Sequence, residues 1–387
     1  MAEPRIELRN LKLWDGKATL AGSGLRINTG VIEAVGAIEP LQPSIDAAGL
    51  WAMPGLIDAH VHLCLDPTRR TPPSATEVPD LNAMAERAEQ MLRAGITTAR
   101  DLGGGHGREL ELRDAIERGK LAGPRLLCAG QPLTSVGGHC HFWGGEVASI
   151  AEAERHIDSQ IARGVDLIKV MASGGVMTRE SSPAAAQFEQ AMLDAIVARS
   201  AHHEKGVAAH CHSTLSIERA TTAGVATIEH CSWVNERGWG AGYDPTLAER
   251  MSERGIQISP TINSNWKRHL TAKDPNRRDQ LRRIFADLEA KGVALIASTD
   301  AGIPGVPHDN LPNALPVFAE LAALSKERVL QTATSAAAAA LGLPLAGRLT
   351  TGAWADVLLI DGDPREDLSR LQSPVGIIAR GRWVKPL

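Results

Sequence analysis

Aromatic residues are scarce in this chain of 387 residues: only 3% are Phe, Trp or Tyr, although eight of them are tryptophan. Cysteine is scarce too, and the five Cys are an odd number without the spacing of a disulfide framework, which favours a reducing compartment. No long apolar run is present, and the first residues are mixed and charged. We therefore expect a cytoplasmic protein with no membrane partner.

An excess of positive charge is also missing, because the formal net charge is -4 at pH 7. Nucleic acids and anionic membranes attract basic surfaces, so we expect neither as a partner. The length is sufficient for one large domain with a small satellite. We expect the chain to form a homo-oligomer and to act on a small-molecule substrate.

Both ends of the chain contain short apolar segments that are separated by glycines and other turn residues. This spacing is typical of a small β-sandwich or sheet. We therefore predict one discontinuous β-sandwich domain from residues 1–53 and 345–387. The expected strands are 6–8, 12–14, 24–27, 31–35, 356–360 and 376–380.

The region between them, residues 54–344, alternates helical stretches with short apolar runs. The expected helices are 81–93, 108–118, 150–163, 189–203 and 279–291, and the expected strands are 56–62, 97–100, 125–129, 167–171, 207–210, 227–230, 256–258 and 294–297. Alternation on this scale predicts a parallel sheet in an α/β fold, and eight units predict a (β/α)8 TIM barrel. Active sites in that fold lie at the carboxyl ends of the strands.

The first of these strands carries a pair of histidines. Residues 52–55, which include Pro54 and Gly55, predict a turn before it. His60 and His62 are two residues apart, so on a strand both imidazoles lie on one face, as ligands of one metal ion would. One such pair is weak evidence, but other candidate ligands follow at later strand ends.

Those later candidates are one lysine, two histidines and one aspartate. Lys169 lies between Ile168 and Val170, and lysine is rarely buried unless it has a function or an ion-pair partner. Burial would favour a neutral amine that can react with CO2 to form a carbamate. The other three residues end the fifth, sixth and eighth expected strands: His210, His230 and Asp300.

This combination of residues resembles the amidohydrolase superfamily. The segments 54–62 and 298–300, with Lys169, carry the likeness, and residues 137–141 and 168–176 are similar to the imidazolonepropionase-related branch that includes Xaa-Pro dipeptidases. The resemblance covers almost the whole chain and implies a distorted (β/α)8 barrel beside a β-sandwich formed by both termini.

The resemblance also implies a binuclear centre of two divalent metal ions, most simply Zn²⁺. His60 and His62 would hold one ion with Asp300, His210 and His230 would hold the other, and a carboxylated Lys169 would bridge them. A metal-bridging hydroxide would attack the amide, and Asp300 would act as general base and then general acid.

Further residues are candidates for contacts with the substrate. His139 could stabilise an oxyanion or could be structural, and His212 could support the ligands or contact substrate. Four tryptophans in loops could wall an apolar pocket or could pack those loops, and two arginines are candidates for a substrate carboxylate. These further candidates are His139, His141, Trp143, Arg179, His212, Trp233, Trp239, Trp266 and Arg268.

Cysteines stand next to several of these histidines, which resembles a thiolate site. Cys211 and Cys231 each follow a proposed ligand by one residue, so strand alternation predicts that they point away from the metals and pack in the core.

Together, these features predict a metal-dependent hydrolase that cleaves a C–N amide bond in a dipeptide or an N-acyl amino acid. A hydrolase that opens a cyclic amide, imide or lactone with the same centre is the alternative. Lys169 speaks against a deaminase, and the complete set of ligands speaks against an inactive scaffold. A fold alone does not decide between these activities.

Overall fold

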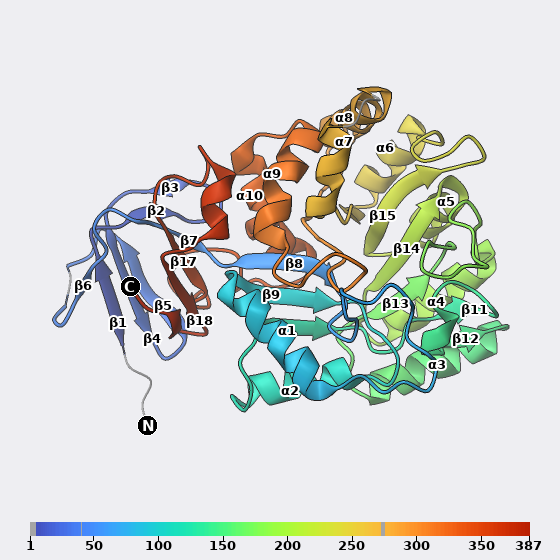
Figure 1. Ribbon diagram of the computed structural model, residues 1–387, viewed down its shortest axis with the longest axis horizontal. Coiled ribbons are helices and arrows are strands. Elements are labelled where there is room, and N and C mark those ends of the chain that lie inside the picture. Colours follow the sequence, from blue (N-terminus) through green and yellow to red (C-terminus); the bar gives the residue numbers. More distant parts are fainter. Residues whose placement is uncertain (1–4, 40, 272–274) are drawn as a thin grey trace.

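The computed structural model describes residues 5–39, 41–271 and 275–387, and it has an α/β fold (Figure 1). Helices and parallel strands form the larger part, and two sheets built from the chain ends lie beside it. No helix in the described ranges has the length and apolar character needed to cross a membrane.

The strands of the larger part belong to two parallel sheets in the described ranges, one of three strands and one of four. The first has the order β10-β9-β8 and the second the order β13-β14-β15-β16. Their bounds are β8 (Leu56–Val61), β9 (Ile96–Asp101), β10 (Arg125–Cys128), β13 (Ile168–Met171), β14 (Val207–Ser213), β15 (Thr227–Val234) and β16 (Gln257–Ser259). All residues of β8, β9, β13 and β14 are buried, as expected for parallel strands that helices cover.

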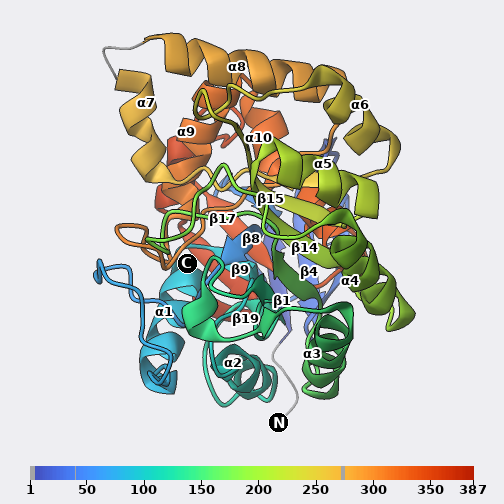
Figure 2. The same ribbon diagram turned by 90° about the vertical axis from the view of Figure 1, so that its right-hand side faces the viewer.

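Helices follow most of these strands, and several lie around their outer side (Figure 2). Helix α1 shows how the sequence sets them: Asp80 accepts a hydrogen bond from the backbone N–H of Asn82 at 3.0 Å, and Met84, Ala88 and Met91 form its buried face. The helices are α1 (Leu81–Arg93), α2 (Arg108–Glu117), α3 (Ile150–Ala162), α4 (Gln190–His202), α5 (Thr214–Ala223), α6 (Pro245–Glu253), α7 (Lys267–Thr271), α8 (Pro275–Ala290), α9 (Leu311–Ala322), α10 (Lys326–Thr332) and α11 (Ser335–Ala340).

The eighth expected strand, residues 294–297, differs from the expectation. Only Leu295 forms a bridge there, to Ile258 of β16. The segment nevertheless bonds to both neighbours, because Ile296 N–H donates to Ile258 O at 2.9 Å and Ala59 N–H donates to Ala297 O at 3.1 Å. These isolated bonds do not make a regular ladder, and the two parallel sheets remain separate.

The expected turn at residues 52–55 is wrong. Residues 51–54 form strand β7, which pairs with β17 so that Pro54 lies opposite Val357. Proline has no N–H to donate to a neighbouring strand, and it is tolerated here because it is the last residue of the strand. Gly55 connects β7 directly to β8, and a Cβ atom at this position would lie 2.1 Å from the Oγ1 atom of Thr97. Gly55 therefore permits the close approach of the chain to Thr97 of β9.

The chain ends form two further sheets. One has the order β5-β4-β1-β6 and the other the order β19-β18-β17-β7-β2-β3, so strands from both ends share one sheet. A separate apolar core contains residues of both sheets, such as Leu8, Leu25, Val357 and Ile378. The bounds are β1 (Ile6–Arg9), β2 (Lys12–Trp14), β3 (Thr19–Leu20), β4 (Gly24–Asn28), β5 (Val31–Gly36), β6 (Ile45–Asp46), β17 (Val357–Ile360), β18 (Gly376–Ala379) and β19 (Arg382–Lys385).

The remaining short elements lie in loops. They are β11 (Thr134–Ser135), β12 (Glu146–Val147) and the 3-10 helices η1 (His141–Trp143), η2 (Ser264–Trp266) and η3 (Leu368–Gln372). The domain bounds 1–53 with 345–387 and 54–344 stay a prediction, and residues 1–4 and 40 lie outside the described ranges.

Candidate metal centre

His60, His62 and Asp300 form the first of two groups of potential metal ligands. The Nε2 atoms of His60 and His62 lie 3.3 Å apart, and Oδ1 of Asp300 lies 3.3 Å from the first and 3.5 Å from the second. His60 lies near the carboxyl end of β8 and His62 follows the strand directly, and Asp300 meets them there because its backbone N–H donates to His60 O at 2.9 Å. Three potential ligand atoms thus converge on one point.

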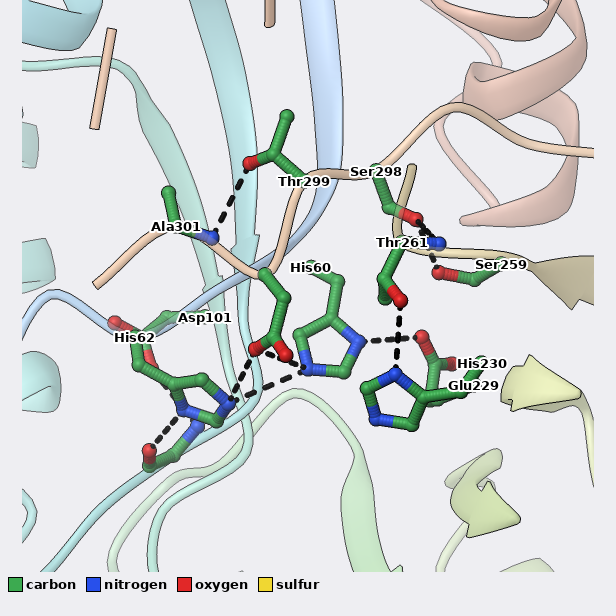
Figure 3. Close-up of polar contacts among 12 residues, drawn as sticks. His60, His62, Asp101, Glu229, His230, Ser259, Thr261, Ser298, Thr299 and Ala301 are labelled. Atoms are coloured by element: carbon green, nitrogen blue, oxygen red, sulfur yellow. Dashed lines mark hydrogen bonds and ion pairs between the residues drawn. The ribbon is translucent and has the colours of Figure 1, made fainter. Parts of the chain in front are cut away.

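In both histidine rings, the hydrogen bond made by Nδ1 determines that Nε2 is the nitrogen that can bind a metal (Figure 3). His62 Nδ1 lies 2.7 Å from the carbonyl oxygen of Gly103, which can only accept, so this nitrogen carries the proton. His60 Nδ1 lies 2.9 Å from the carboxylate of Glu229 and donates to it in the same way. Both Nε2 atoms are therefore left with lone pairs that face each other, and a metal ion held by both residues would relieve that contact.

His210, His212 and His230 form the second group. Their ring centroids are 4.5 Å apart for His210 and His212, 4.5 Å for His210 and His230, and 4.6 Å for His212 and His230. His210 Nε2 donates to the Gly174 carbonyl at 3.1 Å, which leaves Nδ1 as its ligand atom. The ring of His60 lies 5.2 Å from that of His230, so the two groups are neighbours.

His212 was expected to support the ligands or to contact substrate. The structure places it within the second group of potential ligands, with its Nδ1 2.9 Å from the hydroxyl of Ser232, and its role stays a prediction. Its parity with His210 on β14 explains why both side chains face the same cavity.

Lys169 lies in the wall of the same cavity, whose volume is about 280 Å³ and which all the ligand candidates line. Its side chain is buried, and its Nζ atom has no hydrogen-bond partner in the described structure. Burial lowers the pKa of Lys169 to about 8, although Glu229 opposes the shift. An unpartnered buried amine next to two histidine groups fits a lysine that becomes a carbamate and then binds metal.

Burial also lowers the pKa of all five histidines in the two groups, so their rings are neutral at pH 7 and can bind metal: His60, His62, His210, His212 and His230. Burial raises the pKa of Asp300, and the nearby His60 and Lys169 oppose that shift. The donor set of nitrogens, one carboxylate and one amine fits zinc or another divalent transition metal.

The backbone is strained at two of these ligands. His230 has φ 64° and Asp300 has φ 58°, in the left-handed region that residues other than glycine seldom adopt. Thr261, whose hydroxyl lies 2.8 Å from His230 Nδ1, has φ 53°. Such conformations cost about 1–3 kcal/mol each and concentrate at functional sites.

Three buried residues beneath the ligands were not found by sequence reasoning. Glu229 accepts from His60 and, at 2.8 Å, from Arg100, whose Nε also donates to Ala59 O at 2.6 Å. Asp58 accepts from the hydroxyl and the backbone N–H of Thr299, next to Asp300. A charged residue inside an apolar strand was the available signal for Glu229 and Asp58, because such residues are rarely buried without a partner.

Of the two histidines expected in the loop after the third strand, only one lines the metal cavity. His139 lines the metal cavity, its ring lies 4.7 Å from that of His210, and its Nδ1 lies 3.1 Å from the Thr178 hydroxyl. Burial lowers the pKa of His139 to about 4, so its ring is neutral. His141 is only partly buried and does not line that cavity.

Some of the tryptophan and arginine candidates line the metal cavity and the others do not. Trp143, Trp239, Trp266 and Arg268 line the metal cavity. Trp233 is buried elsewhere, 4.9 Å from the ring of Tyr243, and Arg179 is exposed and does not line the cavity.

The prediction that the cysteines pack in the core is confirmed for Cys211 and Cys231. Both are buried in the main apolar cluster as free thiols, and neither belongs to a ligand group in the described part of the chain. Burial raises the pKa of Cys211 to about 12, so its thiol stays protonated.

Comparisons with known proteins identify the family of the chain. The amidohydrolase family model matches residues 51–385. The ochratoxinase of Aspergillus niger is 30% identical over 368 residues, which cover 84% of this chain and 73% of that protein. A solved prolidase in complex with N-methylphosphonate-L-proline is 26% identical, with a TM-score of 0.85 over 99% of this chain and 100% of that chain.

A solved Xaa-Pro dipeptidase with methionine in its active site is also 26% identical, with a TM-score of 0.83 over 99% of this chain and 100% of that chain. The family model spans more than half of the sequence and includes every ligand candidate named above. The chain therefore belongs to the amidohydrolase family and is an enzyme that hydrolyses carbon–nitrogen bonds.

Proposed function

We propose that this enzyme is a metal-dependent hydrolase that cleaves the amide bond of an N-acyl amino acid or a dipeptide. The convergence of His60 Nε2, His62 Nε2 and Asp300 Oδ1 within 3.5 Å carries the proposal. His210 and His230 would hold a second ion, and a carboxylated Lys169 would join the two positions. Zinc is the metal that best suits this mixture of imidazole and carboxylate ligands.

Divalent ions bound here would activate water near neutral pH and polarise the carbonyl of the substrate. The protein supplies the proton transfers: Asp300 takes a proton from the attacking water and returns it to the nitrogen of the leaving amine. His139, neutral and buried beside His210, would donate a hydrogen bond to the oxygen of the scissile carbonyl as negative charge develops on it.

The amide reading is supported by the relatives that resemble the chain over most of its length, an ochratoxinase and two enzymes of the prolidase type. The cavity favours an amino-acid product, because Arg268 lines it and a guanidinium suits a planar carboxylate. Trp266, from the same segment, offers an apolar surface next to that position.

We also propose the finer architecture that the family resemblance implies. The bonds of residues 294–297 to β8 and β16 support a distorted (β/α)8 barrel that closes through this segment. The apolar core shared by the two terminal sheets supports a β-sandwich. A homo-oligomer in the cytoplasm remains our expectation, and light scattering of the purified enzyme tests the first part of it.

A panel of dipeptides and N-acyl amino acids tests the activity, with free amine measured after incubation with the zinc-loaded enzyme. Release of amine from members of the panel supports the proposal. Silence across the panel with metal bound contradicts it, and lactams, imides and lactones are then the substrates to assay for ring opening.

A further inference from the structure

A second and larger cavity lies beside the metal cavity. Its volume is about 590 Å³, within the usual range for binding sites of small molecules. The two cavities share part of their lining, namely Trp143, Val176, Met177 and Ile303. The Trp143 ring lies 5.2 Å from that of the ligand candidate His62, so this shared lining reaches the metal centre itself.

The cavity is formed largely by the segment that follows β8, residues 64–80, together with the start of α1. Its apolar lining includes Leu65, Pro72, Val78, Phe142 and Trp143. The structure thus places a broad apolar surface, two aromatic rings included, at the carboxyl end of β8, the strand that contains His60 and that His62 follows directly.

Most charged groups in this lining already have partners. Arg69 forms an ion pair with Glu77, and Arg87 donates to the carbonyl oxygen of Leu63 at 2.9 Å. Asp80 accepts the hydrogen bond that caps α1. Since an ion pair and hydrogen bonds within the protein already engage these charged groups, the cavity favours an uncharged apolar group over an ion. Arg70 also lines it and is exposed to solvent.

Exposed apolar side chains point to the same conclusion. Val78 and Val176 are 57% and 74% exposed, although both line this cavity. Large apolar residues at the border of a concave site gain stability when a ligand covers them, at roughly 25 cal/mol for each Å² removed from water.

We propose that this cavity binds a bulky, uncharged, ring-containing acyl group, so that the natural substrates are N-aroyl or similarly large N-acyl amino acids. The inference rests on the proposed function and specifies its substrate class. Arg268 lines the smaller metal cavity and is absent from the lining of the larger one, so the amino acid occupies the smaller cavity and the acyl group the larger.

A series of substrates with one leaving amino acid tests this assignment. We expect kcat/KM to rise on the order of 10- to 100-fold from N-acetyl-L-alanine to N-(2-naphthoyl)-L-alanine, because each buried apolar group adds to binding of the transition state. Val78→Trp and Ala83→Trp fill the cavity from two different elements, so each should lower kcat/KM for the naphthoyl compound and abolish this preference.

Glu86→Trp is the matched control, because it places the same indole on α1 at a position outside the cavity lining. It should keep the preference for the naphthoyl compound. A naphthoyl compound hydrolysed no faster than the acetyl one, or an equal effect of Glu86→Trp and Val78→Trp, would overturn the inference while amide hydrolysis itself stands.

Binding of 2-naphthoate, the acyl product, tests the cavity without turnover. Calorimetry should show that Val78→Trp and Ala83→Trp weaken binding at least about tenfold and that Glu86→Trp does not, as expected for a filled site. Equal binding by all four proteins overturns the inference. Failure of the enzyme to cleave any amide, by contrast, contradicts the proposed function, and the binding data then still decide whether the cavity takes an aryl group.

Discussion

Glu229 accepts a hydrogen bond from Nδ1 of His60 at 2.9 Å, and this contact joins a buried carboxylate to a candidate metal ligand. Burial alone would raise the pKa of Glu229, but Arg100 and His60 outweigh it and lower that pKa, so the carboxylate is charged. A charged acceptor at Nδ1 fixes the tautomer that leaves Nε2 free for metal, and it makes that nitrogen a stronger ligand.

Glu229→Gln should therefore weaken metal binding by roughly 10- to 100-fold, the range found when partners of metal-binding histidines are removed. Competition with a coloured chelator measures this affinity directly. Glu33→Gln is the control, because Glu33 is an exposed residue of β5. Equal affinity in the two variants would show that the Glu229 contact does not influence the metal site.

Replacement of Lys169 tests the bridging role of its side chain. Lys169→Ala should lower the rate of amide hydrolysis by more than about 100-fold. Loss of a residue that only hydrogen-bonds to a metal ligand costs up to about 100-fold, and Lys169 is proposed to bind the metals directly. Short-chain carboxylates, which can occupy the space of a carbamate, should restore part of the rate. Activity that survives the substitution without such rescue would remove Lys169 from the mechanism.

His139 and His141 provide a matched pair of substitutions in one loop. His139→Ala should lower kcat by about 10²–10³, as loss of one oxyanion donor does, with little change in KM. His141→Ala should have no such effect, because His141 does not line the metal cavity. Steady-state kinetics on one N-acyl amino acid distinguishes the two cases, and similar losses in both variants would point to a structural role of the loop.

Glu109 makes stability depend on pH. It is buried with no hydrogen-bond partner for either carboxyl oxygen in the described structure, and burial, with a contribution from Asp101, raises its pKa to about 8. The folded protein therefore holds this proton over a pH range in which the unfolded chain, with a pKa near 4.5, has lost it. The contribution of Glu109 to the free energy of unfolding is complete below about pH 4.5, and it is lost as the pH rises through about 8.

Urea unfolding of Glu109→Gln at several pH values tests that expectation. The variant should lose less stability between pH 5 and pH 8.5 than the natural chain, since its amide keeps the neutral form throughout. Glu111→Gln, on the exposed side of the same helix α2, should behave like the natural chain. A steeper pH dependence in Glu109→Gln would contradict the assignment of a protonated buried carboxyl.

The ligand candidates were accessible from the sequence because each lies within or soon after a short apolar segment. His60, His62 and His210 needed only the two-residue period of a strand and the rule that parallel strands end at one edge. The contact between Glu229 and Arg100 joins residues on different strands, and no pattern along the chain specifies which buried charges meet. Sequence reasoning therefore named the ligand candidates and missed the residues that hold them in place.

Two further differences concern strands β15 and β7. His230 and Ser232 of β15 both line the metal cavity, so Trp233, one residue after Ser232, points to the other side as the alternation of a strand requires. Trp233 accordingly packs against Tyr243 and not in the metal cavity. Pro54 and Gly55 resemble a turn in sequence, yet pairing of β7 with β17 holds them extended, because tertiary context outweighs local preference.

Titration of zinc into metal-free enzyme, with the amide-hydrolysis rate recorded at each step, tests the central claim most directly. We expect no activity without metal, and full activity only when about two ions are bound per chain, one for each group of potential ligands. Full activity in the rigorously metal-free protein, or metal bound at both groups with no hydrolysis of any amide, would contradict it.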